Sequence, residues 1–416
     1  MNLLRLKQSL DEINQIGDSD KGIKRLAYTD EEKLATNYFI QQCKKEGLYV
    51  REDECGNVIA RREGQNPVNP AVVIGSHLDS VYNGGRYDGV LGVIAGLEII
   101  RSLNEKNIET EYPIEIISFA CEESARFGVS TIGSKAVTGR LSMDEIEGLK
   151  DKDGITIKEA LASRGLNINR IALAKRRKEE IKAFFELHIE QGPLLEMQKK
   201  QIGIVEGIAS PLRIEVCVEG KSSHSGTTPM NKRHDALLGS SEIVLAVERL
   251  ASKEANKGTV ATTGVLKVKD GAMNVIPGMV KLQIDIRSIS SKSKQNVFAE
   301  LKQFFEQVSH NRGLSITWNV LSNEEPVTLN KDIIYDIEVL CEENGISYLK
   351  MPSGAGHDAM NMASICPTCL LFVPSINGLS HHPDEETSIE DIGVGVELLE
   401  KIIRKYAVAK VGRTIL

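Results

Sequence analysis

The chain has 416 residues, more than one ordinary hydrophobic core accommodates, so two domains are expected. Its formal net charge of −7 and its pI near 5.8 argue against nucleic acid or an anionic membrane surface as the main partner. We find no secretory signal and no apolar stretch long enough to span a bilayer, which favours a cytoplasmic protein.

The first half of the chain alternates helix and strand signals. In chain order, we expect a helix over 30–46, a hairpin over 48–59, a strand over 71–76, a helix over about 90–103, and strands over 114–120 and 184–187. The strands read as continuous apolar runs, which is typical of strands buried on both faces. This alternation predicts an α/β fold around a mostly parallel sheet.

From about residue 208 polar and apolar residues alternate, as in half-exposed antiparallel strands. The expected elements are strands over 213–219 and 280–287, a helix carrying Ile243, Val247 and Leu250, a helix over about 293–308 with Ser293 as its N-cap, then a helix over 333–344 and a strand over 368–373. The sequence therefore predicts a discontinuous catalytic domain, residues 1–207 and 325–416, into which an α+β domain, residues 208–324, is inserted.

Four of the expected strands run into residues of metal-ligand type. These residues are His77 and Asp79 after the first strand, Glu122 and Glu123 after the second, His188 after the third, and His381 and His382 beyond a glycine loop after the fourth. Asp88 lies near the start of the helix that follows the first strand. A pair of divalent ions needs several oxygen or nitrogen ligands, and a shared carboxylate holds the two ions close together. The pattern indicates a dimetal hydrolase site.

Two further roles are expected from position. Asp79 stands two residues after His77, where a carboxylate can orient a metal-bound imidazole. Glu122 is next to a ligand but free of the metal, which suits a general base.

Five strings that occur in order resemble the hydantoinase/carbamoylase branch of the aminoacylase and carboxypeptidase-type dimetal hydrolases. They are GSHLDS at 75–80, GGRYDG at 84–89, CEE at 121–123, LHIEQG at 187–192 and SHHPDE at 380–385. The branch includes N-carbamoyl-L-amino acid hydrolases, β-ureidopropionases and allantoate amidohydrolases, and the resemblance covers nearly the whole chain. The branch assignment rests largely on His188, because peptidase relatives generally have an acidic ligand there.

The resemblance implies a set of ligands for two ions. This set is His77 and His188 for one ion, Glu123 and His381 for the other, and Asp88 as the bridge. His381 is preferred to His382 because the family pattern is Ser-His-x-Pro-x-Glu. The family uses zinc, manganese, cobalt or nickel, so the resemblance does not fix the ion.

The insert carries further matches. His224 lies in a string like the family's histidine-bearing loop, which in relatives comes from the partner subunit and stabilises the oxyanion, so a homodimer is implied. Asn274 and Arg287 match segments that hold the substrate carboxylate, and an arginine can pair with a carboxylate bidentately. Arg287 also lies on the polar face of its strand, where simple solvent exposure is the alternative.

Three other residues are candidates for substrate contact. Gln191 and Gly356 match positions that line the site in relatives. A basic residue near the position of Arg213 occurs in some allantoate-type members, while a solvated strand residue is an equal alternative.

The implied activity is hydrolysis of the carbamoyl C–N bond of an N-carbamoyl-L-amino acid, which gives the amino acid, ammonia and carbon dioxide. The nearest alternative is an allantoate amidohydrolase, followed by a dipeptidase or aminoacylase, which His188 disfavours. A binding protein that keeps the fold without catalysis is the alternative from another class. The family also implies that closure of the inserted domain brings the substrate contacts to the metals.

Overall fold

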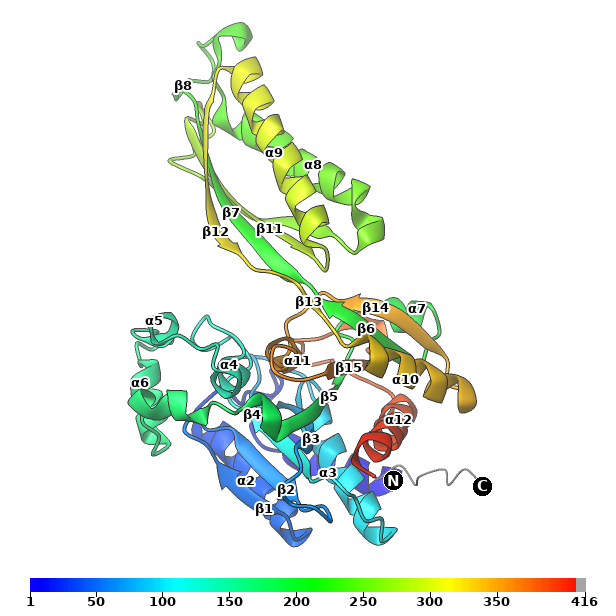
Figure 1. Ribbon diagram of the computed structural model, residues 1–416. Helices are drawn as coiled ribbons and strands as arrows, with labels where there is room; N and C mark the ends of the chain where they lie inside the picture. The colour runs from blue at the N-terminus through cyan, green and yellow to red at the C-terminus, as the bar shows by residue number, and fades with distance from the viewer. Residues whose placement is uncertain (409–416) are drawn as a thin grey trace. The chain divides into compact units, whose positions relative to one another are not determined.

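The computed structural model describes residues 1–408, and the chain forms two compact units (Figure 1). Among the described residues, the large unit comprises Met1–Glu206, Leu329–Met351 and residues 355–408, and the small unit comprises Gly207–Thr328 with Pro352–Gly354. A large, mostly parallel sheet with helices and a separate smaller sheet confirm the expected fold class. None of the helices in the described chain has the length and apolarity of a bilayer-spanning segment.

The sheet of the large unit has four parallel strands at its centre, in the order β4 (Ile114–Phe119), β3 (Ala71–His77), β5 (Ile181–Ile189) and β15 (Thr368–Val373). Antiparallel pairings flank them: β2 (Val58–Arg62) with β4, β1 (Tyr49–Glu52) with β2, and β6 (Ile202–Ile208) with β15. Beyond these, β13 (Val327–Thr328) is antiparallel to β6, and β14 (Tyr348–Ser353) also pairs with β6. Strands β3, β4 and β15 are buried along their whole length, as their apolar runs predict. The hairpin β1–β2 confirms the one expected over 48–59.

Helices cover both faces of this sheet (Figure 1). On the face to which Leu187 points lie α3 (Val90–Glu105) and α12 (Ile389–Ala407), with α1 (Leu3–Asn14) and α2 (Asp30–Lys45) packed against α3. On the opposite face the Ala359 N–H of α11 (Asp358–Met362) donates to Glu186, and α11 packs on α4 (Ile132–Thr138). The remaining helices of this unit are α5 (Met143–Ile146), α6 (Ile157–Ser163), α7 (Leu194–Met197) and α10 (Lys331–Glu343).

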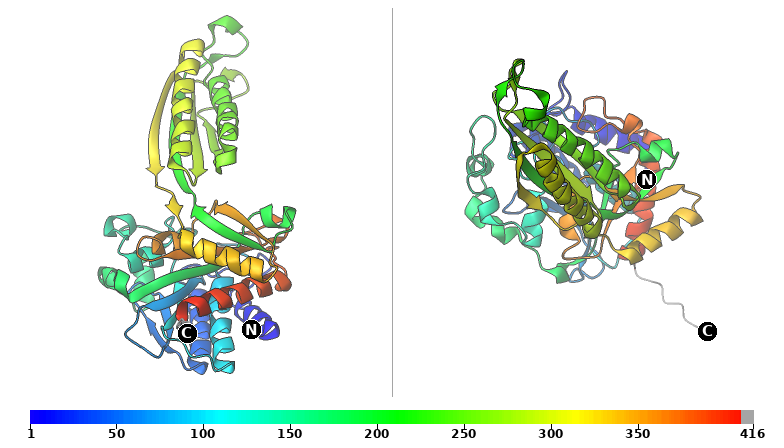
Figure 2. Two further views of the ribbon diagram at one scale, coloured as in Figure 1. Left: turned by 45° about the vertical axis from the view of Figure 1, so that its right-hand side comes forward. Right: turned by 90° about the horizontal axis from the view of Figure 1, so that it is seen from above.

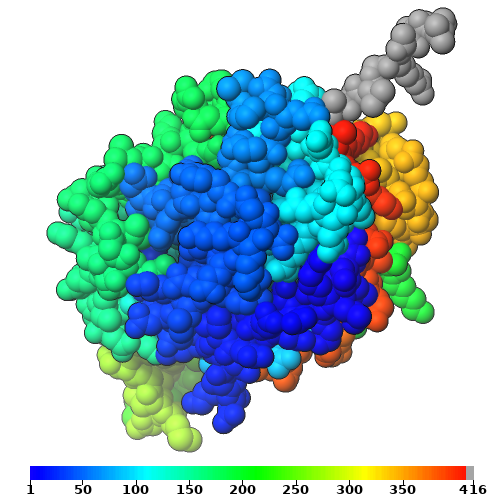
Figure 3. Space-filling model, turned by 90° about the horizontal axis from the view of Figure 1, so that it is seen from below, coloured from blue at the N-terminus to red at the C-terminus, as the bar shows by residue number. Residues whose placement is uncertain are grey.

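The start of the chain is tied into the large unit. The ammonium group of Met1 lies 3.4 Å from the carboxylate of Glu400 in α12, and the N–H of Asn2 donates to Glu98 of α3 at 2.7 Å. Figure 3 shows the dark blue N-terminal residues against the cyan surface of the α3 region. The first two residues are therefore bonded to α12 and α3, the two helices that cover one face of the central sheet.

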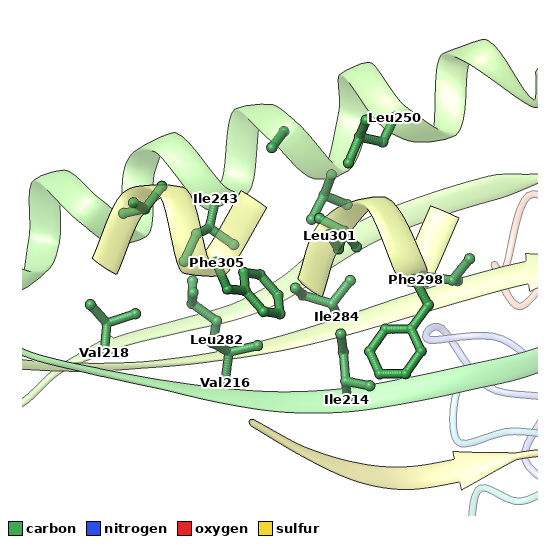
Figure 4. Packing of buried hydrophobic residues seen from close by; sticks show 14 of the residues in the cluster. Ile214, Val216, Val218, Ile243, Leu250, Leu282, Ile284, Phe298, Leu301 and Phe305 are labelled. Atoms are coloured by element: carbon green, nitrogen blue, oxygen red, sulfur yellow. The ribbon is translucent and has the colours of Figure 1, made fainter. Parts of the chain in front are cut away.

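The small unit is a four-stranded antiparallel sheet covered on one face by two helices. The strand order is β12 (Ser315–Asn323), β7 (Ser210–Glu219), β11 (Met279–Ser288) and β9 (Val260–Val268). Helices α8 (Ala236–Lys253) and α9 (Ser291–Arg312) lie side by side on it (Figure 2). Between sheet and helices lies an apolar core that includes Ile214, Val216, Val218, Leu282, Ile284, Ile243, Leu250, Phe298, Leu301 and Phe305 (Figure 4). A short ladder pairs β8 (Ser223–His224) with β10 (Val275–Ile276).

Two local expectations are corrected. The N-cap of α9 is Ser290, not Ser293, because Ser290 has extended backbone and its hydroxyl accepts the N–H of Ser293. Several serines precede this helix, so the sequence alone did not single out the capping one. In addition, β5 continues to Ile189, so His188 lies inside the strand rather than beyond its end.

Candidate metal centre

The candidate site lies where the central parallel strands end. β3 ends at His77, the chain reaches Glu122 and Glu123 directly after β4, and His188 lies one residue before the end of β5. His381, in the loop after β15, has a φ of 54°, which turns the chain sharply. Because the carboxyl ends of parallel strands meet at one edge of a sheet, residues distant in sequence come together here.

A glycine-rich turn brings Asp88 to the same edge. Gly89, the N-cap of α3, has a φ of 69°, and a Cβ built on it would lie 2.4 Å from the imidazole of His77. Only glycine therefore fits between this imidazole and the start of the helix. The N–H of Gly89 lies 3.1 Å from Nε2 of His188, which faces the site.

The donor atoms form two groups that share Asp88. In one group the ligand atoms of His77, Asp88 and His188 lie within 4.8 Å of one another, and in the other those of Asp88, Glu123 and His381 do. Oδ1 of Asp88 lies 3.4 Å from Nε2 of His77 and 3.1 Å from Nε2 of His188. Oδ2 lies 3.1 Å from Nε2 of His381, which is 3.2 Å from Oε1 of Glu123. The arrangement offers one carboxylate to two neighbouring positions.

Backbone carbonyls orient the two buried imidazoles. Nδ1 of His77 lies 2.9 Å from the carbonyl oxygen of Asp79, and Nδ1 of His188 lies 2.9 Å from that of Ile189. Each carbonyl accepts the proton on Nδ1, so in the neutral form of each ring the Nε2 lone pair is directed into the site, as a metal ligand requires.

The carboxylate of Asp79 has a more specific place than the sequence suggested. Its two oxygens accept the backbone N–H groups of Glu122 and Glu123, at 3.1 and 3.0 Å, while Oδ1 is 3.7 Å from Nδ1 of His77. Asp79 therefore connects the end of β3 to the loop after β4: its carbonyl orients His77 and its carboxylate holds the two glutamates.

The three imidazoles determine the charge state of Asp88. In the metal-free protein, burial by itself raises the pKa of this carboxyl, but hydrogen bonds from the protonated imidazoles of His188, His381 and His77 outweigh it and hold the pKa well below its usual range. Asp88 is thus an anion, as a bridging ligand must be.

Glu122 lies beside the two groups of metal-ligand atoms, in surroundings that suit a residue that accepts a proton. It is buried, and Oε2 lies 3.8 Å from Nε2 of His77. Burial raises the pKa of Glu122 well above its usual value, although His77 acts in the opposite direction. A carboxyl group with a raised pKa can take a proton and later release it.

Three further residues support Asp88, and sequence reasoning had assigned a role to only one of them. Oδ2 of Asp88 accepts hydrogen bonds from Nε2 of Gln191 at 2.9 Å and from Oγ of Ser380 at 3.1 Å. Glu385 is buried and accepts the N–H groups of Tyr87 and Asp88, at 2.8 and 3.1 Å. Its Oε2 also lies 3.0 Å from Oγ of Ser380, whose single proton is shared between Asp88 and Glu385. Ser380 and Glu385 both stand in the string SHHPDE, so the signal was present without an assigned role.

The neighbouring histidines His381 and His382 are equally exposed but have different contacts. Their side chains are 49% and 51% exposed. Nε2 of His381 contacts Asp88 and Glu123, whereas Nδ1 of His382 accepts the N–H of Asp384 at 3.1 Å. The donor groups found among the described residues contain His381 and not His382.

The remaining candidates are not members of the two donor groups. His224 and Asn274 lie on adjoining segments of the small unit, where the N–H of Ser225 donates to the carbonyl of Asn274 at 2.9 Å. Both side chains are exposed. Arg213 and Arg287 meet in a separate cluster of the same unit around Asp285. Gly356 lies in an exposed part of the large unit's loop before α11.

The donor set fits divalent transition metals. Imidazole nitrogen and carboxylate oxygen together suit zinc, manganese, cobalt and nickel, whereas magnesium and calcium prefer oxygen alone. The donors are almost all buried, so ligation there removes little side-chain freedom.

Comparisons with known proteins agree with this geometry. The model of Peptidase family M20/M25/M40 matches residues 73–405. An uncharacterized hydrolase of Haemophilus influenzae is 45% identical over 98% of this chain and 99% of its own length. The N-carbamoyl-L-amino acid amidohydrolase of Geobacillus stearothermophilus is 38% identical over 97% of this chain and 98% of its own length. The allantoate amidohydrolase of Escherichia coli is 33% identical over 97% of each chain.

A solved structure is similar along the whole chain. The amidase of the hydantoinase/carbamoylase family from Burkholderia multivorans has a TM-score of 0.92 and 36% identity, with 99% of each chain covered. The chain therefore belongs to the M20/M25/M40 family, whose members are metal-dependent hydrolases. This confirms the resemblance to the hydantoinase/carbamoylase branch and the expectation that the protein is a hydrolytic enzyme.

Proposed function

We propose that the protein hydrolyses the carbamoyl C–N bond of N-carbamoyl-L-amino acids to give the amino acid, ammonia and carbon dioxide. The observation that carries the proposal is the sharing of Asp88 by two groups of donor atoms, with the buried Glu122 beside them. The similarity to an N-carbamoyl-L-amino acid amidohydrolase over 97% of the chain supports the choice of bond.

The proposed cofactor is a pair of divalent ions of the zinc, manganese, cobalt or nickel type. His77 and His188 would hold one ion, Glu123 and His381 the other, and Asp88 both. Such ions, when bound, polarise a carbonyl oxygen and lower the pKa of water.

The protein's own groups would perform the proton transfers. Glu122 accepts the proton of the attacking water and delivers it to the leaving nitrogen, because a buried carboxyl with a raised pKa is suited to both steps. Asp79 keeps Glu122 in place through the backbone N–H. His224 stabilises the oxyanion, and Arg287 and Asn274 bind the substrate carboxylate, with Gln191 and Gly356 as further contacts.

The alternative within the same chemistry is hydrolysis of allantoate. The similarity to an allantoate amidohydrolase over 97% of the chain favours it, and Arg213 is the residue that bears on the choice. In either case we propose a cytoplasmic homodimer, since the family supplies the histidine at the position of His224 from the partner subunit. A fully active monomer at assay concentration would remove the dimer from the proposal.

The test is ammonia release by the manganese-loaded protein from N-carbamoyl-L-amino acids, their D forms, N-carbamoyl-β-alanine and allantoate. Preference for carbamoyl-L-amino acids supports the proposal, and preference for allantoate replaces it with the alternative. The same assay is run on Glu122→Gln, which keeps the size of the side chain but cannot accept the proton. We expect kcat to fall by about 10²- to 10⁴-fold with unchanged metal content. A nearly active variant would show that Glu122 is not the base.

A further inference from the structure

The face of the small unit's sheet opposite its helices carries a cluster of three charged residues. Asp285 and Arg287 are alternate residues of β11, so their side chains point to the same face. Arg213 of β7 stands directly opposite Asp285 in the antiparallel register. Two guanidinium groups thus surround one carboxylate.

Arg287 is held from two sides. Its Nε lies 3.3 Å and its Nη2 lies 3.1 Å from the same oxygen of Asp285, Oδ2, so two donors of the guanidinium converge on one carboxylate oxygen. Its Nη1 donates to the carbonyl oxygen of Gly354 at 3.1 Å. The guanidinium plane is therefore fixed by a carboxylate on one side and a backbone carbonyl on another.

These contacts leave a fork of donors available. A guanidinium has five N–H groups, and the contacts with Asp285 and Gly354 use one each from Nε, Nη2 and Nη1. One N–H remains on each terminal nitrogen, which is the number that a second carboxylate takes in a bidentate pair. The side chain of Arg287 is 34% exposed, so part of it is open to solvent.

We propose that Asp285 is a positioning residue for substrate recognition: it holds the guanidinium of Arg287 so that its remaining N–H fork receives the carboxylate of the substrate. This inference rests on the proposed function, in which Arg287 binds that carboxylate. Asp285 itself does not touch the substrate.

The partial exposure of the cluster favours orientation over stability as its role. The side chains of Asp285 and Arg213 are 31% and 50% exposed, and ion pairs at such positions contribute little to folding. Arg213 reaches Oδ2 of Asp285 with Nε at 3.4 Å, a longer contact than that of Arg287. Arg213 thus helps to orient Asp285, which in turn fixes Arg287.

The test compares the acid substrate found in the ammonia assay with its primary carboxamide. In Asp285→Asn we expect KM for the acid to rise about tenfold, because Arg287 loses a charged partner and its fixed orientation. The inhibition or Michaelis constant of the carboxamide, which offers no carboxylate, stays within about twofold. A purely structural defect would weaken both compounds alike, and a purely electrostatic effect would lower KM for the acid, because Asp285→Asn makes the cluster more positive.

Glu215→Gln is the matched control. Glu215 lies on the same face of β7, two residues from Arg213, and contacts Lys281 and Gln283 at 3.6 and 3.3 Å. The change removes the same charge from the same sheet, so acid and carboxamide should both behave as in the wild type. An unchanged or lowered KM of Asp285→Asn for the acid overturns the proposal.

Arg287→Ala separates this inference from the proposed function beneath it. If Arg287→Ala weakens the acid selectively and Asp285→Asn does not, only the positioning role of Asp285 is lost. If Arg287→Ala treats acid and carboxamide as the wild type does, the carboxylate contact itself fails. Non-additivity in the double variant, with no further rise of KM beyond that of Arg287→Ala, is expected because Asp285 acts through Arg287.

Discussion

Replacing Asp79 by asparagine tests whether one carboxylate holds the loop that carries both glutamates. Each carboxylate oxygen of Asp79 accepts one backbone N–H, from Glu122 at 3.1 Å and from Glu123 at 3.0 Å, and the side chain is buried. Asparagine keeps the shape but has one acceptor oxygen and one NH₂ group. One of the two N–H groups must then face another donor.

The magnitude follows from these two hydrogen bonds. A buried N–H without an acceptor costs about 1–3 kcal/mol, and the hydrogen bond that remains loses about 1 kcal/mol because its acceptor is no longer charged. We therefore expect Asp79→Asn to lower the free energy of unfolding by about 2–4 kcal/mol. Because Glu122 and Glu123 shift with their backbone, kcat should fall about 10- to 100-fold and metal affinity should weaken by a similar factor.

The assay is urea unfolding of the metal-free protein, with kcat and metal content measured on the manganese-loaded protein. Glu190→Gln is the control, because its two carboxylate oxygens likewise accept consecutive N–H groups, those of Leu194 and Leu195 at 2.7 and 2.8 Å, but at the start of α7. Both variants should lose stability, and only Asp79→Asn should lose much of kcat. Equal losses of kcat, or a fully stable and active Asp79→Asn, would refute the reasoning.

Two further predictions concern the metals. His381→Ala should lower the bound manganese by about one ion per subunit and abolish most activity. His382→Ala should retain both the manganese and the activity, because of the two histidines only His381 contacts Asp88 and Glu123. Elemental analysis of the purified variants is the measurement, and the reverse result would assign the ligand role to His382 instead. Hydrogen bonds with Asp88 and Glu123 raise the pKa of His381 to about 11 in the metal-free protein. The protonated imidazole therefore stabilises the folded protein in full below about pH 6.5, the ordinary pKa of histidine. This stabilisation is lost as the pH rises towards 11. Manganese must displace that proton, so the rise of Tm on adding manganese should grow from about pH 6.5 to 9, and a rise independent of pH would contradict the ligand role.

The sequence was informative about the candidate metal centre because ligand chemistry restricts residue type. His77, Glu123 and His188 could be placed together because apolar runs locate buried strands, and parallel strands end at one edge. The contacts of Asp79 were less predictable, because a carboxylate two residues from a histidine can reach the ring or the backbone of another loop. Only the fold shows that the loop after β4 passes within hydrogen-bonding distance of Asp79.

The contacts among the proposed substrate-binding residues were harder to derive, because pairing across a sheet decides them. The alternation of β11 places Asp285 and Arg287 on one face, but it does not say which residue of β7 stands opposite. That register is set by the apolar residues packed against the two helices, since a slip of one residue would turn the core side chains outward. Arg213 reaches Asp285 as a consequence of this packing.

The same distinction explains why family membership does not fix the substrate. Relatives named for carbamoyl amino acids and for allantoate are 38% and 33% identical to this chain over nearly its full length. Under the proposed function, Asp88 and its ligand neighbours would act on the ureido group that both substrates contain, so they have no reason to differ between the two activities. Discrimination between the two substrates must come from groups that contact the rest of the substrate molecule. The charged cluster around Asp285 is a candidate for such a group, and all its residues belong to the small unit. A variant of this cluster that changes the ratio of carbamoyl amino acid to allantoate turnover, with metal content unchanged, would place specificity in the small unit and chemistry in the large one.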